Sequence, residues 1–367
     1  MKCNLLCRVW HFLRKIFCWL FGCCCGGGSG GSGSGCCSAN KKYVSSPRHV
    51  YEKDCVKMLR KPKGDAIIGK GYHRSGWFYV VSGLARLDSE KGILLDDFVE
   101  QNFCYAQNPN IYTEDWVGIF HHPPFPPDFS NEKEKMSVYL NTPAFKESAK
   151  HLKLAITLTE YHRNELENYL DCPVVCIPHP IENNIDGNFE QWNYTRYQQH
   201  RKIIQLGFYL RNTQLIYQTP YIEGVKRLRL WSNREWVKKY DAEVVRYWRA
   251  NGNRLLYGGV QDMTFQSASS YDRLLSQSVI IMELFDASAN NGVLDCIIRN
   301  TPIIINRHPA VVEYLGADYP LYFDDPKEIP ALMKKVYSAH VYLRDMDKSH
   351  LGIKFFTRQL MSFVNEL

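Results

Sequence analysis

The stretch of this chain that most constrains its fold is residues 278–323. Residues 279–284 form a run of β-branched and apolar side chains with the length of a buried strand. A polar loop follows, and apolar residues then recur at helical spacing until residues 300–302 end the helix. The pattern continues with a strand, a helix and a further strand at residues 303–305, 308–315 and 321–323. Strands that alternate with helices in this way predict a parallel α/β sheet.

A candidate ligand site follows from this order of elements. In parallel α/β sheets, ligands bind beyond the carboxyl ends of the strands, where N–H groups at the start of a helix attract phosphate. Asn290, Asn291 and Gly292 lie at such a helix start, so we expect them to line a binding site. Asp286, Ser288 and Asn291 are also good helix caps, and capping is the alternative interpretation.

The same stretch resembles the nucleotide-sugar half of a retaining-type GT-B glycosyltransferase, similar to glycosyltransferase families 1 and 4. That half carries one acidic residue in a loop and a second in the next helix, after seven intervening positions. Thr-Pro, a strand and a helix that bears Glu come next. Here Asp295 takes the second acidic position, Thr301-Pro302 match directly, and Glu313 takes the later position.

The first acidic position of the family pattern falls on Ala287, with Asp286 one position away and Glu283 further back. The resemblance implies that Asp286 or Glu283 faces the donor sugar. It also implies that Asp295 accepts hydrogen bonds from the ribose hydroxyls. The N–H groups of residues 291–293, the last of them Val293, would then hold the diphosphate at the helix start.

Basic residues that contact the donor diphosphate are expected near the first strand of this half, residues 202–207. The family commonly places one such residue in the loop after that strand and another a little later. Arg211 lies in the loop, and a guanidinium pairs bidentately with phosphate. Lys226 and Arg227 are candidates for the second position. Because basic residues and helix dipoles neutralise the diphosphate in GT-B enzymes, the resemblance implies no bound metal and no cofactor; the nucleotide-sugar is a substrate.

A glycine-rich loop lies between a predicted strand at residues 65–68 and a predicted helix at residues 77–87. Such a loop lets the backbone approach a ligand closely. It lacks the full dinucleotide fingerprint and the downstream acid, which argues against a short-chain oxidoreductase. GT-B enzymes open their acceptor-side domain in this way, so the resemblance makes Gly69, Gly71 and His73 acceptor-side candidates.

Two histidines, His121 and His122, follow the predicted strand at residues 117–120. Histidine donates hydrogen bonds to hydroxyls and transfers protons near neutral pH, so both are catalytic candidates. A structural role at the end of a strand is the alternative. We expect no metal site here, because adjacent side chains of a strand point to opposite faces.

The order of elements and the resemblance together predict an α/β fold of the GT-B type, in which two Rossmann-like domains face each other across a cleft. The chain of 367 residues is long enough for two such domains. In the second domain, Trp236, Tyr240, Val244 and Trp248 recur every four residues and predict a helix with a core-facing stripe. We expect a tail at residues 1–45 and an acceptor-side domain at residues 46–198. A nucleotide-sugar-binding domain is expected at residues 199–345, followed by a helix at residues 346–367 that crosses back to the first domain.

The N-terminal tail carries most of the thirteen cysteines and the excess of positive charge. Residues 1–60 hold ten Lys and Arg against two acids, whereas the whole chain has a net charge of +7. The folded body is therefore close to neutral and offers no electrostatic footprint for nucleic acid. Residues 5–25 are apolar but interrupted by basic side chains, so an amphipathic helix in a membrane interface is expected rather than a membrane span.

Cysteine clusters in the tail are candidates for S-acylation, here palmitoylation, which would make this a membrane-associated lipoprotein. The residues are Cys23, Cys24, Cys25, Cys36 and Cys37. Two acyl groups with a basic patch suffice for stable anchoring, and the glycine/serine stretch at residues 26–35 is a flexible tether. A signal peptide and a cysteine-rich metal tract are the alternatives. The remaining cysteines are scattered, as in reduced proteins, so we expect the body at the cytosolic face of a membrane.

The function expected from the resemblance is that of a glycosyltransferase. It would transfer a sugar from a nucleotide-sugar donor to a glycan, lipid or protein acceptor. The irregular first acidic position favours a second hypothesis, in which a degenerate GT-B protein binds sugar or nucleotide without turnover.

Overall fold

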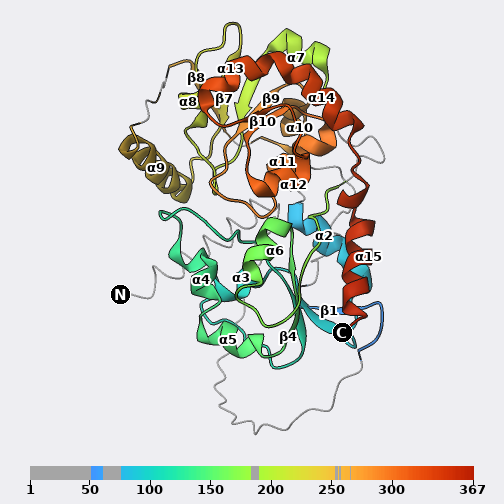
Figure 1. Ribbon diagram of the computed structural model, residues 1–367. Helices are drawn as coiled ribbons and strands as arrows, with labels where there is room; N and C mark the ends of the chain where they lie inside the picture. The colour runs from blue at the N-terminus through green and yellow to red at the C-terminus, as the bar shows by residue number, and fades with distance from the viewer. Residues whose placement is uncertain (1–50, 61–75, 183–189, 253–254, 256–257, 265) are drawn as a thin grey trace, which may run out of the picture.

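The computed structural model describes residues 51–60, 76–182 and 190–367, except 253–254, 256–257 and 265. Within these ranges the chain forms two parallel α/β domains, one above the other in Figure 1. The predicted GT-B arrangement of two Rossmann-like domains is therefore confirmed. The tail with its five candidate acylation sites, the predicted strand at 65–68 and the candidates Gly69, Gly71 and His73 lie outside the described residues.

The first domain is built on a sheet of five parallel strands whose spatial order follows the sequence. The strands are β1 (Val56–Met58), β2 (Ile93–Asp96), β3 (Trp116–Ile119), β4 (Leu152–Thr157) and β5 (Val174–Cys176). The helices are α2 (Gly76–Leu84), α3 (Val99–Phe103), α4 (Met136–Tyr139), α5 (Pro143–Ala149) and α6 (Glu160–Leu166), with 3₁₀ turns η1 (Ala85–Leu87) and η2 (Glu132–Glu134).

Side chains of this sheet alternate between two apolar cores, as the period of a strand requires. Ile93 and Leu95 of β2 pack with α2 on one face, whereas Leu94 packs with α3, α4 and α5 on the other. Both faces are covered, so the strands are rich in apolar residues. The C-terminal helix α15 (Ile353–Val364) joins the first of these cores, and Figure 1 shows it beside α2.

The second domain contains six parallel strands in the order β11-β10-β9-β6-β7-β8. Their bounds are β6 (Lys202–Gln205), β7 (Lys226–Leu230), β8 (Val260–Met263), β9 (Val279–Met282), β10 (Ile303–Asn306) and β11 (Tyr322–Phe323). The chain leaves β6 towards one edge and returns through β9 to build the other edge. The strand order therefore reverses between β6 and β9, and such a switch point is where open α/β sheets bind ligands.

The helices of the second domain cover both faces of this sheet. They are α7 (Tyr194–His200), α8 (Leu215–Gln218), α9 (Glu235–Ala250), α10 (Ala268–Ser276), α11 (Asn291–Arg299), α12 (Pro309–Leu315), α13 (Ile329–Leu332) and α14 (Val336–Asp345). Three 3₁₀ turns accompany them, η3 (Pro326–Glu328), η4 (Met333–Lys335) and η5 (Ser349–Leu351). The strands and helices predicted for residues 278–323 are thus present within a few residues of their expected bounds.

The two domains meet at the start of α6. Glu313 of α12 accepts hydrogen bonds from the N–H groups of Glu160 at 2.6 Å and Tyr161 at 2.7 Å. Tyr314 donates from its hydroxyl to the carbonyl of Leu158 at 2.6 Å, and His162 contacts Ser288 Oγ through Nδ1 at 2.9 Å. Side chains of the second domain therefore hold one helix of the first.

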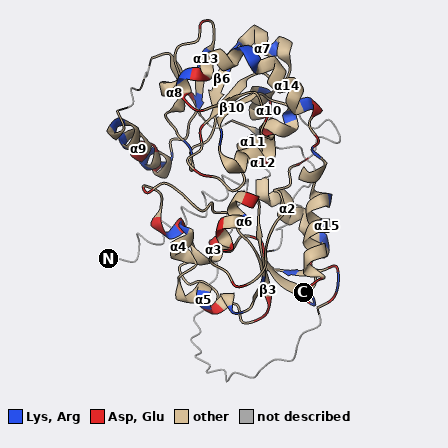
Figure 2. Ribbon diagram, viewed as in Figure 1, with Lys and Arg blue, Asp and Glu red and all other residues tan. Residues whose placement is uncertain are grey.

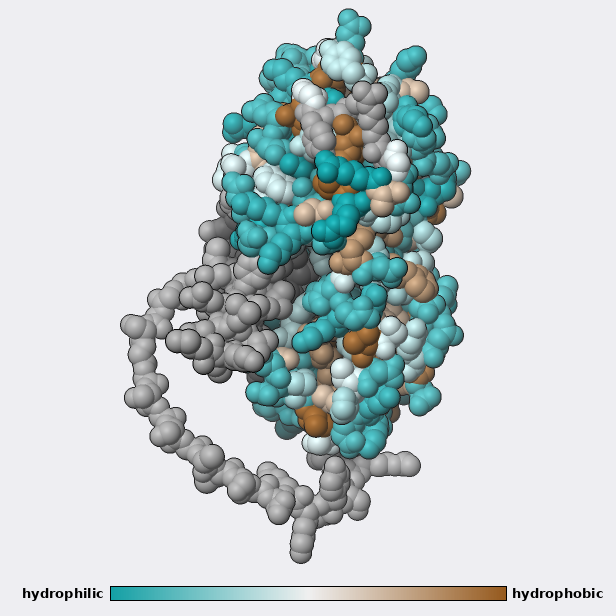
Figure 3. Space-filling model, turned by 90° about the vertical axis from the view of Figure 1, so that its left-hand side faces the viewer, coloured by the Kyte–Doolittle hydropathy of each residue, from teal (hydrophilic) through white to brown (hydrophobic). Residues whose placement is uncertain are grey.

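Charged and apolar residues are mixed in the views of Figures 2 and 3. Figure 2 shows Lys and Arg interspersed with Asp and Glu over both domains, and the face in Figure 3 is mostly hydrophilic, with scattered hydrophobic residues. In the part of the chain that the structure describes, no helix has both the length and the hydropathy of a membrane span. The cysteines described are all free thiols, at positions 55, 104, 172, 176 and 296.

Candidate functional site

A cavity of about 1070 Å³ lies between the domains, at the carboxyl ends of both sheets. The second domain contributes the loop after β6, the loop between β9 and α11, and the start of α9. The first domain contributes residues that follow β2 and β3. The residues predicted from the sequence that line it are His121, His122, Arg211, Asp286, Asn290, Asn291, Gly292 and Asp295.

Arg211 is one of three basic residues that line this cavity, with Arg60 and Lys239. Arg60 forms ion pairs with Asp96 and Asp97. Nη2 of Arg211 donates to Asn290 Oδ1 at 3.0 Å and its Nη1 lies 3.5 Å from the carbonyl of Leu206. No carboxylate of the described residues forms an ion pair with it, and burial lowers its pKa. A partly buried guanidinium without an ion-pair partner is costly, and an anionic ligand in the cavity would compensate its charge.

The backbone is shaped to hold Arg211 in this place. Gly207 has a φ of +72°, and a Cβ there would lie 1.3 Å from Nη1 of Arg211. Any other residue would be strained by its backbone conformation and would also displace the guanidinium. The requirement for glycine between β6 and Arg211 thus follows from the packing of the arginine itself.

The start of α11 points to the same cavity, but the side chain of Asn290 caps it. Asn290 Oδ1 accepts hydrogen bonds from the N–H groups of Gly292 at 3.0 Å and Val293 at 3.3 Å. These two N–H groups were predicted to hold a diphosphate, and in this structure they are already satisfied. The helix dipole remains directed at the cavity, next to Arg211.

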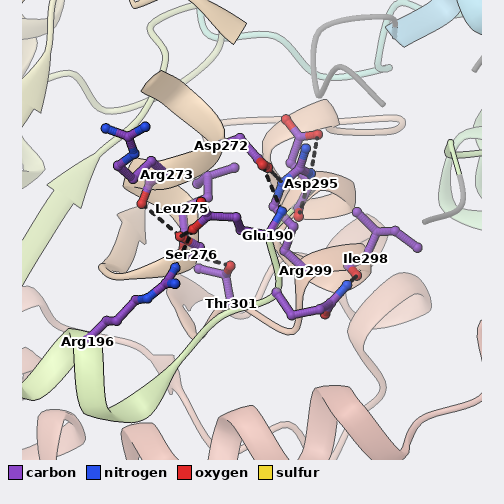
Figure 4. A network of polar contacts seen from close by, with 11 residues as sticks. Glu190, Arg196, Asp272, Arg273, Leu275, Ser276, Asp295, Ile298, Arg299 and Thr301 are labelled. Atoms are coloured by element: carbon purple, nitrogen blue, oxygen red, sulfur yellow. Dashed lines mark hydrogen bonds and ion pairs between the residues drawn. The ribbon is translucent and has the colours of Figure 1, made fainter. Parts of the chain in front are cut away.

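Asp295 lines the cavity one turn further along α11. Its Oδ1 accepts a hydrogen bond from Nη1 of Arg299 at 3.3 Å, and Arg299 also donates to Asp272 at 2.6 Å. Figure 4 shows the guanidinium between the two carboxylates. The predicted ribose-binding residue therefore lies at the cavity, with a buried arginine behind it.

Asp286 lines the cavity, but its carboxylate is engaged on both oxygens. Oδ2 accepts from the N–H of Phe125 at 2.5 Å, and Oδ1 accepts from the hydroxyl of Tyr161 at 3.0 Å. Nε2 of His308 lies 3.2 Å from the same Oδ1. Phe125 and Tyr161 belong to the first domain, so Asp286 links the domains rather than presenting a free carboxylate to a sugar.

Three other predicted residues lie away from the cavity. Glu283 accepts a hydrogen bond from Nδ2 of Asn212 at 2.6 Å, and burial raises its pKa. Glu313 caps α6, as described above. Lys226 is exposed at the amino end of β7, whereas Leu230 at the other end of that strand lines the cavity. Lys226 is therefore at the wrong end of the sheet for a diphosphate.

The two histidines lie together at the first-domain side. His121 is packed edge-on against Trp77 and Phe98, with ring centroids 4.3 and 4.2 Å away, and burial lowers its pKa well below 6.5. His122 contacts the hydroxyl of Tyr105 through Nε2 at 3.0 Å. The surroundings of His121 favour a neutral, structural ring, whereas His122 forms a polar pair on the cavity wall.

An acidic group at the end of β2 was not predicted from the sequence. Asp96 lines the cavity and accepts hydrogen bonds from the hydroxyl of Tyr112 at 2.8 Å and from Arg60 at 3.3 Å. Burial raises the pKa of Asp96 from 3.8 to about 6. The signal was present in the apolar run Ile93–Leu95, which Asp96 and Asp97 follow, but this run was not assigned as a strand.

Aromatic side chains of α9 also contribute to the cavity. Trp236 and Tyr240 line it, although the sequence placed them in a core stripe. Of that stripe, Val244 is fully buried. Phe129 of the first domain packs against Tyr240 and Phe285, with ring centroids 5.8 and 5.5 Å away. The stripe therefore lines the cavity between the domains and forms a domain contact, in addition to packing in a core.

Among the described residues, no group of three or more His, Cys, Asp or Glu side chains is arranged to hold a metal ion. No protein-family model matches the chain. No curated protein sequence matches it either.

Solved structures do match. A structure of trehalose-6-phosphate synthase, studied with bisubstrate glycomimetics for glycosyltransfer with retention, has a TM-score of 0.53 and 12% identity, over 83% of this chain and 84% of that chain. An apo structure of OtsA has a TM-score of 0.50 and 10% identity, over 77% and 75%. HepE of Anabaena, in complex with UDP and glucose, has a TM-score of 0.50 and 10% identity, over 69% and 72%. At such identities the likeness concerns the fold: this chain has the GT-B fold.

Proposed function

We propose that this protein is a glycosyltransferase that transfers a sugar from a nucleotide-sugar donor to a glycan, lipid or protein acceptor. The observation that carries the proposal is Arg211, a partly buried cation that forms no ion pair with a carboxylate among the described residues, beside the start of α11. It lies at the switch point of the second sheet, where a diphosphate is the expected anion. HepE, which shares the fold, was solved with UDP and glucose.

In this proposal the two sides of the cavity have different tasks. Arg211 and the dipole of α11 hold the diphosphate, and Asp295 accepts hydrogen bonds from the ribose. The acceptor enters from the first domain, where His122 and Asp96 line the wall. Stabilisation of the leaving diphosphate by Arg211 would lower the barrier to transfer, because the negative charge of the diphosphate develops as the glycosidic bond breaks.

The experiment that tests the proposal is a thermal-shift screen of the full-length protein with UDP, GDP, ADP and CMP. A nucleotide at 100 times its dissociation constant stabilises the folded state by about 2.7 kcal/mol. We expect one of the four to raise the melting temperature of the wild type, and the variant Arg211→Gln to lose that shift. Arg246→Gln is the matched control, because Arg246 is an exposed arginine of the same domain.

Either of two results would overturn the proposal. One is that none of the four nucleotides shifts the melting temperature of the wild type. The other is that Arg211→Gln keeps the full shift, which would place the anion elsewhere.

A second candidate function is binding of a sugar or nucleotide without turnover. Asp286 favours it, because the carboxylate expected to face the donor sugar is engaged by Phe125 and Tyr161. The capped N–H groups of Gly292 and Val293 favour it as well. Both candidates predict nucleotide binding, and they differ in whether the glycosidic bond of the donor is cleaved.

We also propose that the N-terminal tail tethers the protein to the cytosolic face of a membrane. The support is in the sequence: two cysteine clusters, a basic surplus and a glycine/serine linker. Replacement of Cys23, Cys24, Cys25, Cys36 and Cys37 by serine should release the protein from the membrane fraction and abolish hydroxylamine-sensitive acyl labelling. Serine at the five free cysteines of the body is the matched control. Membrane binding that survives the five tail substitutions would contradict acyl anchoring.

A further inference from the structure

Asp295 is supported from behind by a buried arginine, Arg299. The two residues lie four positions apart on α11, and the side chain of Arg299 is 1% exposed, against 13% for Asp295. Nη1 of Arg299 donates to Oδ1 of Asp295 at 3.3 Å and to its backbone carbonyl at 3.2 Å. The arginine therefore contacts both the side chain and the backbone of the residue that lines the cavity.

Asp272 of α10 is the closer partner of this arginine. Nε of Arg299 donates to Oδ1 of Asp272 at 2.6 Å, and Oδ2 of Asp272 accepts from the N–H of Glu190 at 2.8 Å. Figure 4 shows this chain of contacts, with Arg299 between the two carboxylates. Asp272 is thereby fixed on both oxygens and fixes the guanidinium in turn.

The distances decide how the charge is shared. The contact of Arg299 to Asp272 is 0.7 Å shorter than its contact to Asp295, 2.6 against 3.3 Å. A buried guanidinium needs compensation by an acid, and Asp272 supplies it. Two carboxylates share this guanidinium, and Asp295, the more distant of the two, lines the cavity.

We propose that Arg299 and Asp272 are positioning residues that hold the Asp295 carboxylate towards the cavity as an acceptor for the vicinal hydroxyls of a nucleotide ribose. This inference rests on the proposed function, because it requires a nucleotide in the cavity. Without Asp272, Asp295 would be the carboxylate left to compensate the positive charge of the buried Arg299. The carboxylate would then turn back towards α10 and lose its hydrogen bonds to the ribose.

The fork of an arginine suits this task better than the ammonium of a lysine. A planar guanidinium contacts two carboxylates in fixed directions, whereas lysine carries one compact charge on a flexible stem. Aspartate also has one methylene less than glutamate, so the carboxylate of Asp295 reaches less far from α11. The hydrogen bonds from the Asp295 carboxylate to the ribose therefore depend more strongly on the orientation of the side chain.

The test compares ribonucleotides with their 2′-deoxy and 3′-deoxy counterparts on the full-length protein, by calorimetric titration of UDP, GDP and ADP. The deoxy compounds keep the base and the diphosphate, so the ratio of the two dissociation constants isolates the hydroxyl contact. A hydrogen bond to a charged group predicts that the wild type binds the ribonucleotide about tenfold more tightly. Asp295→Asn should lower this ratio.

The variants Asp272→Asn and Arg299→Lys should lower the ratio to about 2, because the Asp295 carboxylate loses its position but keeps its charge. Their affinity for the deoxy compounds should stay at the wild-type value, which a loss of folding would not allow. Arg196→Gln is the matched control. Arg196 pairs with Glu190 in the same network but away from the cavity, so this variant should keep the wild-type ratio.

The outcomes separate the inference from the proposed function. If Asp295→Asn lowers the ratio while Asp272→Asn and Arg299→Lys keep it, the positioning role is wrong and the proposed function stands. If both variants weaken ribonucleotides and deoxy compounds equally, their role is structural and the inference is also wrong. If the wild type binds none of the three nucleotides, the proposed function fails and the inference fails with it. Should Arg299→Lys not fold, Asp272→Asn alone decides, since it keeps the arginine.

Discussion

Arg211 and Asp286 are charged residues of the same cavity with opposite surroundings. Arg211 has hydrogen bonds to neutral oxygens only, in the part of the chain that is described, and burial lowers its pKa. Asp286 accepts hydrogen bonds on both carboxylate oxygens. A cavity with a cation that forms no ion pair and an acid whose oxygens are both engaged favours an anionic ligand. At the residue scale, the site is therefore better prepared to bind a diphosphate than to supply a carboxylate to a sugar.

Replacement of Asp286 by alanine tests whether this residue is structural. Its side chain is 1% exposed, and the change would leave the N–H of Phe125 and the hydroxyl of Tyr161 without their acceptor. We expect the free energy of unfolding to fall by about 3 kcal/mol, measured by urea denaturation. Asp324→Ala, at an exposed acid of the same domain, should stay near the wild-type value. A variant Asp286→Ala with wild-type stability and no turnover would instead indicate a catalytic carboxylate.

At the scale of elements, α6 is the part of the first domain most dependent on the second. Glu313 caps its first turn, and Ser288 contacts His162 within it. Burial lowers the pKa of His162 from 6.5 to about 3. The folded state therefore holds this ring neutral, at the contact between α6 and the loop that precedes α11.

The neutral His162 ring should make the folded state less stable at acid pH, and a single substitution can test this. The unfolded chain protonates His162 below pH 6.5 while the folded state does not, so stability falls as the pH falls below 6.5. We expect this residue to account for a loss of about 2 kcal/mol between pH 7.5 and pH 5, seen as a flatter pH profile in His162→Gln. His200→Gln, at an exposed histidine, should keep the wild-type profile. An unchanged profile in His162→Gln would contradict a neutral buried ring.

Elements were predictable where one physical signal dominated. The apolar run that forms β9 and the helical spacing of α11 predicted both elements correctly. β7 was missed because basic residues interrupt its sequence, so it has no continuous apolar run. In the structure, Arg227 and Arg229 of β7 are buried, and Arg229 pairs with Asp262 at 2.9 Å. A partner on another strand is not visible in a local pattern.

At the scale of the molecule, the sequence predicted two facing domains, and the site needs both of them. Arg211 and the histidines were found because they follow strands that were recognised. Asp96 was missed with its strand, and the contacts of Glu313 were not predicted because its partners, the N–H groups of Glu160 and Tyr161, belong to the other domain. The spacing of a family motif predicts which residues lie at one edge of one sheet. Contacts between residues of two domains can be seen only in the folded structure.

The measurement that tests the central claim most directly is cleavage of nucleotide-sugars by the full-length protein. UDP-, GDP- and ADP-glucose are incubated without acceptor, and the release of free sugar and nucleoside diphosphate is followed by chromatography. A glycosyltransferase with this cavity should release both from one donor by slow transfer to water, and Arg211→Gln should reduce the rate by about 100-fold, as expected for a lost charge contact at the leaving group. Nucleotide binding without release from any donor would contradict the glycosyltransferase and leave a GT-B protein that binds its ligand without turnover.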